Sequence, residues 1–377
     1  MTTTEIPDLP SRLEMDESIK VITDNAKRIF CWNYDRSRDQ LVTLYNKAMS
    51  SQWNSVTELD WSTEVDPEEL VRMSPQQSVI VGLARAAAEI EGSPLASWGE
   101  KEFTQLGIES LKAQLSQFMH GEQGAMMVAA KIVETVPWID ARYYAATQTM
   151  DEARHVEVYE RYIGKLAIVY PISPWLKATI DKTLQADRWV KIAIGMNMVV
   201  EGLALAAFHN MRRATTCPLL RALTDGVLRD ESRHVAFGNL YVRETLADMH
   251  PDDREDVAQF AFEVVKMMAD SMGGVKGDKP PLPDPGFVRM LENVGVDLED
   301  FLASAREAGL SGIRAKLPPG QIHSFKDLMM PALFRVGAIT ERSRALFDAE
   351  GIPVWEDASK LEALENLDTG EIELPRQ

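Results

Sequence analysis

The sequence is short of cysteine, of basic residues and of strand signals, and each shortage excludes a class of protein. Only Cys31 and Cys217 occur in 377 residues, which is too few for a disulfide framework and suits a reducing cytoplasm. Lys and Arg total 40 against 58 for Asp and Glu, a formal net charge of −18. So acidic a surface repels phosphate backbones, and we expect no nucleic-acid partner. Alternating β-branched runs and Asn-Gly hairpin turns are absent, which excludes a sheet-rich fold.

An apolar leader is also missing. The chain begins MTTTEIPDLPSRLEMDESIK, which is acidic and has no apolar run, so we expect no secretory signal. We also expect no segment long and apolar enough to span a membrane. Together these features predict a cytoplasmic protein with no membrane partner.

Apolar residues at spacings of three and four dominate instead, and they predict an all-α fold. The pattern predicts helices over 37–52, 67–92, 99–135, 139–169, 175–213, 218–247, 251–272 and 324–349. The segment GGVKGDKPPLPDPG (273–286) interrupts this pattern. We therefore expect a helical domain over 1–272, followed by a helical appendage with an acidic tail over 273–377.

One hexapeptide is written twice. DEARHV begins at Asp151 and DESRHV at Asp230, an offset of 79 residues. In each copy a glutamate and a histidine lie three residues apart, so they share one face of a helix. Thirty residues before each hexapeptide glutamate stands another glutamate within apolar helix. The offset therefore relates three pairs of residues: Glu122 and Glu201, Glu152 and Glu231, His155 and His234.

Two helical hairpins explain the intervals of 30. The midpoint between Glu122 and Glu152 is Pro137, and the midpoint between Glu201 and Glu231 is Thr216, beside Cys217 and Pro218. A helix is expected to end at each midpoint, so the two glutamates of each pair would face each other across a hairpin. If the hairpins pack together about a pseudo-twofold axis, four carboxylates and two imidazoles converge in one bundle. The turns then lie at opposite ends, and the chain from about Tyr170 to Arg188 crosses the length of the bundle.

The converging residues predict a site for two metal ions. An ion-pair network with the nearby arginines is the alternative, but ion pairs do not require histidines at matched positions. Buried carboxylates repel one another unless a cation holds them, and mixed carboxylate and imidazole ligands suit iron or manganese. We expect Glu152 and Glu231 to bridge the metals, with Glu122 and His155 completing one site and Glu201 and His234 the other.

Four charged residues adjoin these ligands. Asp151 and Asp230 are expected to accept a proton from the outer nitrogen of a ligand histidine. Arg154 and Arg233 are expected to pair with these aspartates. An exposed charged turn is the alternative for all four.

At these positions the chain resembles the di-iron carboxylate proteins of the ferritin-like superfamily, over about residues 118–239. The paired DExRH form is similar to the hydroxylase subunits of bacterial multicomponent monooxygenases. The resemblance implies a ferritin-like four-helix bundle with flanking helices and two iron ions, or a manganese/iron pair, that activate dioxygen. It also implies a small-molecule substrate and a separate electron donor, a ferredoxin or a reductase, because no flavin or iron–sulfur motif is present.

Departures from individual families leave the reaction open. Leu205 stands where the monooxygenases have threonine, Ala204 where acyl-carrier-protein desaturases have it, and Val227 where arylamine N-oxygenases have a third histidine. Tyr159 falls where the ribonucleotide reductase small subunit carries its radical tyrosine, and it is the candidate catalytic residue. A packed core tyrosine is the alternative.

The sequence thus predicts a non-haem di-iron monooxygenase or oxidase that hydroxylates, N-oxygenates or desaturates a small organic substrate. A radical-generating subunit and an iron-handling ferroxidase remain alternatives. A homodimer is a further expectation.

Overall fold

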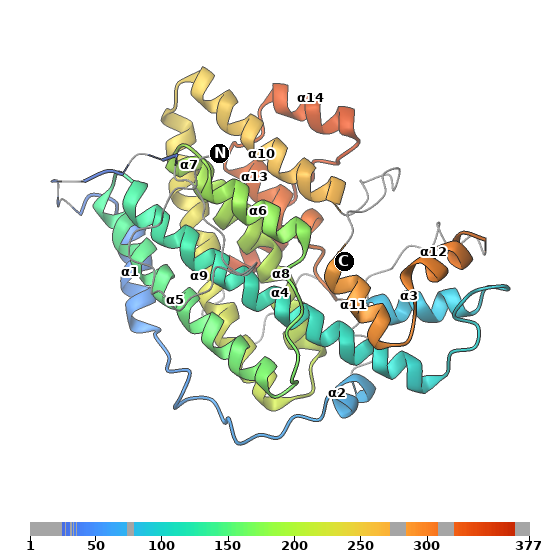
Figure 1. Cartoon of the computed structure of the whole chain (residues 1–377). Helices are drawn as coiled ribbons and strands as arrows, with labels where there is room; N and C mark the ends of the chain where they lie inside the picture. Colours follow the sequence, from blue (N-terminus) through green and yellow to red (C-terminus); the bar gives the residue numbers. More distant parts are fainter. Residues whose placement is uncertain are drawn as a thin grey trace, which may run out of the picture.

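The computed structural model describes residues 25–26, 28–30, 32, 34, 36–73, 79–271, 284–307 and 320–365. Every regular element among these residues is a helix (Figure 1), which confirms the all-α fold. In chain order the elements are α1 (Asp39–Ser50), α2 (Pro67–Met73), α3 (Val79–Ala88), α4 (Glu100–Thr135), α5 (Ile139–Gly164), α6 (Pro174–Leu184), α7 (Trp189–Ala193), the π-helix η1 (Ile194–Val200), α8 (Glu201–Ala214), α9 (Pro218–Asp248), α10 (Pro251–Ser271), α11 (Pro285–Asn293), α12 (Leu298–Glu307), the π-helix η3 (Ser324–Met329), α13 (Met330–Arg335), α14 (Glu341–Glu350) and α15 (Ser359–Glu365).

Two long hairpins form the central bundle, as expected for a ferritin-like fold. Helix α4 pairs with α5 along its length, and the continuous helix α7–η1–α8 pairs with α9. The turns fall at the predicted prolines: Pro137 follows α4, and Pro218 begins α9, where the missing amide of proline costs the helix nothing. The inner faces of these helices belong to one large apolar cluster.

The predicted crossover is confirmed, and helix α6 forms most of it. Where the crossover begins, the amide of Tyr170 donates to Ser116 Oγ at 3.0 Å. Where α6 ends, the ammonium group of Lys131 donates to the carbonyl of Leu184. Helix α6 therefore runs parallel to α4 and returns the chain to the Pro137 end, where the rings of Trp138 and Trp189 lie 5.2 Å apart.

The second turn lies at the other end of the bundle. Cys217, directly before α9, contacts the hydroxyl of Tyr162 near the end of α5. The two hairpin turns are thus at opposite ends, as pseudo-twofold symmetry requires. A close approach of the crossover depends on glycine, because a Cβ on Gly195 would lie 2.2 Å from Thr183 Oγ1.

Two predicted helices are interrupted in the structure. The expected helix 175–213 is broken after Leu184, where α6 ends, and resumes at Trp189. The expected helix 324–349 ends at Arg335, and Gly337 adopts the left-handed conformation (φ 81°) before α14 begins. Helices α2 and α3 cover parts of the expected helix 67–92, and the junction 74–78 lies outside the described residues.

The elements after residue 320 pack on the bundle. Side chains of η3, α13, α14 and α15, among them Leu328, Leu333, Phe347 and Leu361, belong to the same apolar cluster as the hairpins. Most of the expected boundary segment, residues 272–283, lies outside the described residues, so the division at 272 stays a prediction.

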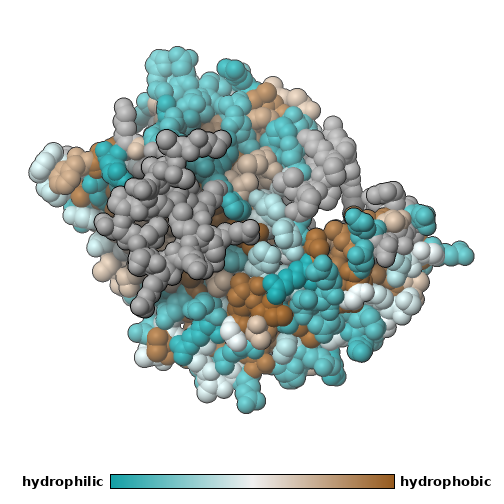
Figure 2. Space-filling view, viewed as in Figure 1, coloured by the Kyte–Doolittle hydropathy of each residue, from teal (hydrophilic) through white to brown (hydrophobic). Residues whose placement is uncertain are grey.

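One expectation about membranes was wrong as stated. The continuous helix Trp189–Ala214 is long and apolar enough to cross a membrane, but 83% of its apolar window is buried inside the protein. It is the most enclosed helix of the bundle, which accounts for its composition. In the view of Figure 2 the outer surface is mainly hydrophilic, with apolar residues in separate patches, in keeping with the net charge of −18.

Candidate metal centre

The six residues expected as ligands meet at the centre of the bundle. Atoms within 4.8 Å of one another form two groups of four, and Glu152 and Glu231 belong to both groups. Glu122 and His155 complete the first group, and Glu201 completes the second together with His234. All six side chains are at most 4% exposed. The division is the one that the offset of 79 predicts.

Both histidines present the same nitrogen to the carboxylates. His155 Nδ1 lies 3.1 Å from Glu231 Oε1 and 3.3 Å from Glu122 Oε2. His234 Nδ1 lies 3.2 Å from Glu152 Oε1 and 3.2 Å from Glu231 Oε2. The two rings are 5.9 Å apart, with the carboxylates gathered between them.

The outer nitrogens contact the aspartates, as expected, but across the pseudo-twofold axis. His155 Nε2 lies 3.1 Å from Asp230, in the other hexapeptide, and His234 Nε2 lies 3.4 Å from Asp151. Arg154 pairs with both aspartates, at 2.9 Å from Asp230. Each arginine pairs with the aspartate of its own hexapeptide. The alternative of an exposed charged turn is wrong, because both aspartates and both arginines are buried.

Sequence reasoning missed two partners of these aspartates. Directly after α1, Gln52 donates to Asp151 at 3.0 Å, and the indole nitrogen of Trp53 donates to Asp230 at 2.8 Å. A Cβ on Gly226 would lie 2.9 Å from the Trp53 ring, so glycine is what admits the indole. Both residues lie at the level of the aspartates, on the face formed by α5 and α9.

Two buried amides were missed as well. Gln148, one turn before Glu152, donates to Glu201 at 2.9 Å and to Glu152 at 3.1 Å. Asn197 donates to the Gln148 carbonyl at 3.3 Å. Asn197 sits in η1, and the wider turn of a π-helix often marks a functional site. Its place in sequence, one turn before Glu201, was the available signal.

Burial and mutual charge set the protonation of the cluster. Burial and the charge of Glu231 raise the pKa of Glu122 and of Glu201 well above the ordinary value. For Glu152, burial opposes ionisation, but the charges and hydrogen bonds of the two histidines outweigh it and hold its pKa well below the usual range. Burial also opposes charge on the histidines, yet the surrounding carboxylates raise the pKa of His155 and His234 well above the usual value. Without metal, protons occupy this site.

Unpaired oxygens show that the cluster fits cations. Glu122 Oε1 is buried and has no hydrogen-bond partner among the described residues. Glu152 Oε2 and Glu231 Oε1 face only His155 Nδ1, at 3.4 and 3.1 Å and without the geometry of a full hydrogen bond. Leaving such atoms unpaired is costly. Two divalent ions at the shared carboxylates would satisfy them and balance the four negative charges, so the residues fit a dimetal cofactor.

Tyr159, the expected catalytic residue, is fully buried one turn after His155. Its ring stacks on Phe208 at 5.7 Å and meets Phe118 edge-on at 5.6 Å. Burial and the charge of Glu122 raise the pKa of its hydroxyl well above the usual value. The phenol is therefore neutral and set among aromatic rings beside the cluster, and its catalytic role stays a prediction.

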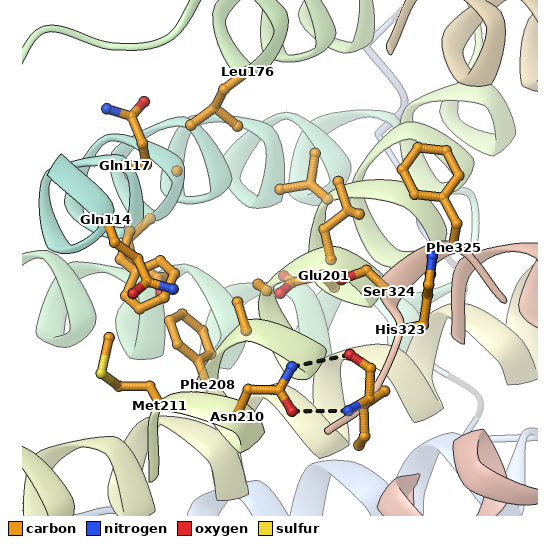
Figure 3. Close-up of a pocket in the computed structure, with 18 of the residues that line it drawn as sticks. Gln114, Gln117, Leu176, Glu201, Phe208, Asn210, Met211, His323, Ser324 and Phe325 are labelled. Atoms are coloured by element: carbon orange, nitrogen blue, oxygen red, sulfur yellow. Dashed lines mark hydrogen bonds between the residues drawn. The ribbon is translucent and has the colours of Figure 1, made fainter. Parts of the chain in front are cut away.

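A cavity of about 620 Å³ extends to the unshared glutamates, Glu122 and Glu201, between α4 and α8. Figure 3 shows the Glu201 carboxylate at its inner side, and Phe208, Asn210 and Met211 along α8. The loop before η3 closes one side, where Asn210 forms two 2.9 Å hydrogen bonds with the backbone of Ile322. Most of the lining is apolar, and its members include Phe118, Ala125, Leu176, Val200, Leu203, Ala204, Ala207 and Phe325.

The two halves of the centre differ in their surroundings. The offset of 79 carries Phe118 onto Asn197 and Gln148 onto Val227. The Glu201–His234 side therefore has two amides that the Glu122–His155 side lacks. The Glu122–His155 side has instead the aromatic group of Phe118, Tyr159 and Phe208. The ligands are pseudo-symmetric and their environments are not.

Comparisons with known proteins give only distant similarity. No family model and no curated protein matches the chain. Among solved structures, an R2-like ligand-binding oxidase with an aerobically reconstituted Mn/Fe cofactor is 16% identical, with 85% of this chain and 96% of that chain covered and a TM-score of 0.39. A variant of such an oxidase with an anaerobically reconstituted Mn/Fe cofactor is 15% identical, with coverages of 82% and 96% and a TM-score of 0.40. Similarity at this level assigns no activity, so the functional argument rests on the chain's own residues.

Proposed function

We propose that this chain is a dimetal oxidoreductase that activates dioxygen and oxidises a small apolar organic substrate. The metal pair is iron, or manganese with iron, held by Glu122, Glu152, His155, Glu201, Glu231 and His234. Bound in this ligand set, such a pair supplies the dioxygen chemistry and the redox equivalents.

One observation carries the proposal. The two ligand groups share Glu152 and Glu231, and the unshared Glu122 and Glu201 line an apolar cavity. A site that only stores iron needs access for hydrated ions. Here the way to the carboxylates passes between apolar side chains, which suits an organic molecule better than a hydrated cation. The arrangement favours oxidation of a substrate over iron handling.

The protein's own residues orient the ligands and exclude water. Asp230 and Asp151 accept hydrogen bonds from the histidines, fix their rings and direct Nδ1 at the metals. Gln148 holds Glu152 and Glu201 at a fixed separation. The apolar cavity wall keeps water from the reacting centre.

The cavity also indicates the substrate class. Apart from the two ligand glutamates, His323 is the only lining residue in the described part of the chain with an ionisable side chain, and its Nδ1 already accepts the amide of Lys326. The lining residues that the structure describes include no arginine or lysine to neutralise an anionic substrate. An uncharged, largely apolar molecule therefore fits best. Its reaction, hydroxylation, N-oxygenation or desaturation, depends on the bond placed next to Glu122 and Glu201.

Stopped-flow mixing of the anaerobically Fe(II)-loaded protein with oxygen tests the proposal. We expect a transient absorbance band that persists without substrate and decays faster when small apolar molecules are added. The variant Ala207→Phe fills the cavity away from the ligands, so it should keep the band and lose the acceleration. Simple oxidation of iron without a transient, unaffected by any organic molecule, would favour a ferroxidase instead.

A further inference from the structure

A continuous row of aromatic rings leads away from the proposed metal centre. Tyr144 and Phe237 have ring centroids 4.3 Å apart, and Phe237 stacks on Tyr241 at 4.2 Å. Tyr241 stacks on Trp189 at 5.2 Å with an interplanar angle of 17°, and Trp189 meets Trp138 at 5.2 Å. We call these five residues the aromatic ladder. It draws on α5, α9 and α7 and on the Pro137 turn.

The inner end of the aromatic ladder adjoins the centre. The Tyr241 hydroxyl lies 3.4 Å from Asn197 Oδ1, and Asn197 connects through Gln148 to Glu201. The outer end reaches the surface, because Trp138 and Trp189 are only half-buried.

The fold itself does not need this row of rings. The offset of 79 relates the hairpins, and in the other half it places Leu223, Val158, Tyr162, Ser110 and Cys217 at the corresponding positions. Four of these five residues are not aromatic, and Leu223, Val158, Tyr162 and Cys217 belong to the same apolar cluster as the hairpins. The aromatic ladder therefore belongs to one side of the centre, the side with Gln148 and Asn197. Core packing alone gives no reason for that difference.

We propose that the aromatic ladder carries single electrons between the surface at Trp138 and the metal centre, with Trp189 and Trp138 as the residues that are transiently oxidised. In each transfer Trp189 loses one electron to the oxidised centre and becomes a radical cation. Trp138 then reduces Trp189, and a one-electron donor of the iron–sulfur or flavoprotein class reduces Trp138. No bond forms or breaks, and the net result is one electron moved inward.

The tyrosines serve as bridges in this scheme. Oxidation of a phenol requires a base to take its proton. The Tyr144 hydroxyl makes no hydrogen bond within the described part of the chain, and the Tyr241 hydroxyl faces an amide oxygen, which is a poor base. The indoles have no such requirement. A second route, through His155, Asp230 and Trp53, is also connected by hydrogen bonds, so an experiment must separate the two.

Peptide mapping by mass spectrometry tests the route, which rests on the proposed function. The iron-loaded protein is exposed to oxygen without substrate or donor, so that an indole radical is trapped by dioxygen as an oxygenated tryptophan. We expect this mark at Trp138 and Trp189 in the wild-type protein. In Trp189→Phe, metal content and oxygen uptake should persist while the mark at Trp138 is lost. In Trp138→Phe, the mark at Trp189 should remain.

A matched control is Trp98→Phe, because Trp98 is also half-buried but packs on Phe103 in a separate apolar cluster. This change should leave the marks at Trp138 and Trp189 as they are. Equal marking of Trp138 with and without the Trp189 indole would overturn the route, as would marking confined to Trp53. Such results leave oxygen uptake intact and the proposed function standing. A wild-type protein that takes up no oxygen overturns both.

Discussion

The close contact between η1 and α9 permits a quantitative prediction about Gly238. A Cβ at this position would lie 2.3 Å from Asn197 Cβ and 2.7 Å from Met198 Cε. Carbon atoms in contact are about 3.5–4.0 Å apart, so in Gly238→Ala the two helices must separate by about 1 Å. Asn197 Cβ is fixed to the backbone and cannot rotate away.

The expected net cost is about 1–2 kcal/mol. Overpacking a core costs about 1–3 kcal/mol, and the rigid neighbour favours the upper part of that range. The higher helix propensity of alanine returns up to about 1 kcal/mol. The matched control is Gly202→Ala, where the nearest atoms, those of Met329, lie at 3.6–3.7 Å, an ordinary contact. This control should be neutral or stabilised by up to about 1 kcal/mol.

Urea unfolding of both metal-free variants, followed by far-ultraviolet circular dichroism, measures the difference. We expect Gly202→Ala to exceed Gly238→Ala by about 2–3 kcal/mol in free energy of unfolding. Equal stabilities would refute the packing argument. Displacement of η1 also moves Asn197, which positions Gln148. The Gly238→Ala variant should therefore bind the metal ion on the Glu201–His234 side less tightly.

Three further predictions concern the centre itself. The double variant Glu152→Ala/Glu231→Ala should lose both metal ions by elemental analysis, because both ligand groups share these residues. The control Glu160→Ala, which removes an exposed glutamate of α5, should keep two ions, and two ions retained in the double variant would contradict the assignment. Metal affinity should fall as pH falls through the raised pKa values of both histidines and both unshared glutamates, because protons then compete with the metal for these side chains. Competition titrations with a chelator of known affinity check this, and a flat pH profile would contradict it. Trp53→Phe should weaken metal binding by about 10- to 100-fold, as expected when an outer partner is lost, and an unchanged affinity in the same titration would show that Asp230 needs no help from the indole.

The sequence predicted which six residues meet at the candidate centre because the repeat encodes their positions directly. A shared offset and equal intervals of 30 residues define two hairpins, and proline at each midpoint places the turns. Helical geometry then determines which residues face one another. The crossover followed from the same reasoning. Pseudo-twofold symmetry puts the two turns at opposite ends, so the segment between the hairpins must cross the length of the bundle.

The outer contacts were harder to predict because they come from other parts of the chain. Gln52 lies 99 residues before Asp151 and Trp53 lies 177 residues before Asp230, and no periodicity connects them. Gln148 lies one turn before a ligand, but its partner Glu201 is on another helix. The break after Leu184 has no proline within it, and the π-helix before Glu201 has no sequence signature in the apolar run.

Each histidine of the centre contacts the aspartate of the other hexapeptide, and this crossed pairing makes the two hairpins depend on each other. His155 contacts the aspartate of the second copy, and His234 contacts that of the first. This reciprocity is the defining property of an isologous interface, in which residue i of one copy touches j of the other and j touches i. The single chain therefore has the internal architecture of a symmetric homodimer whose two subunits have been fused. Neither hairpin contains a complete half of the centre, so the proposed metal ions would bind only where the two hairpins are associated.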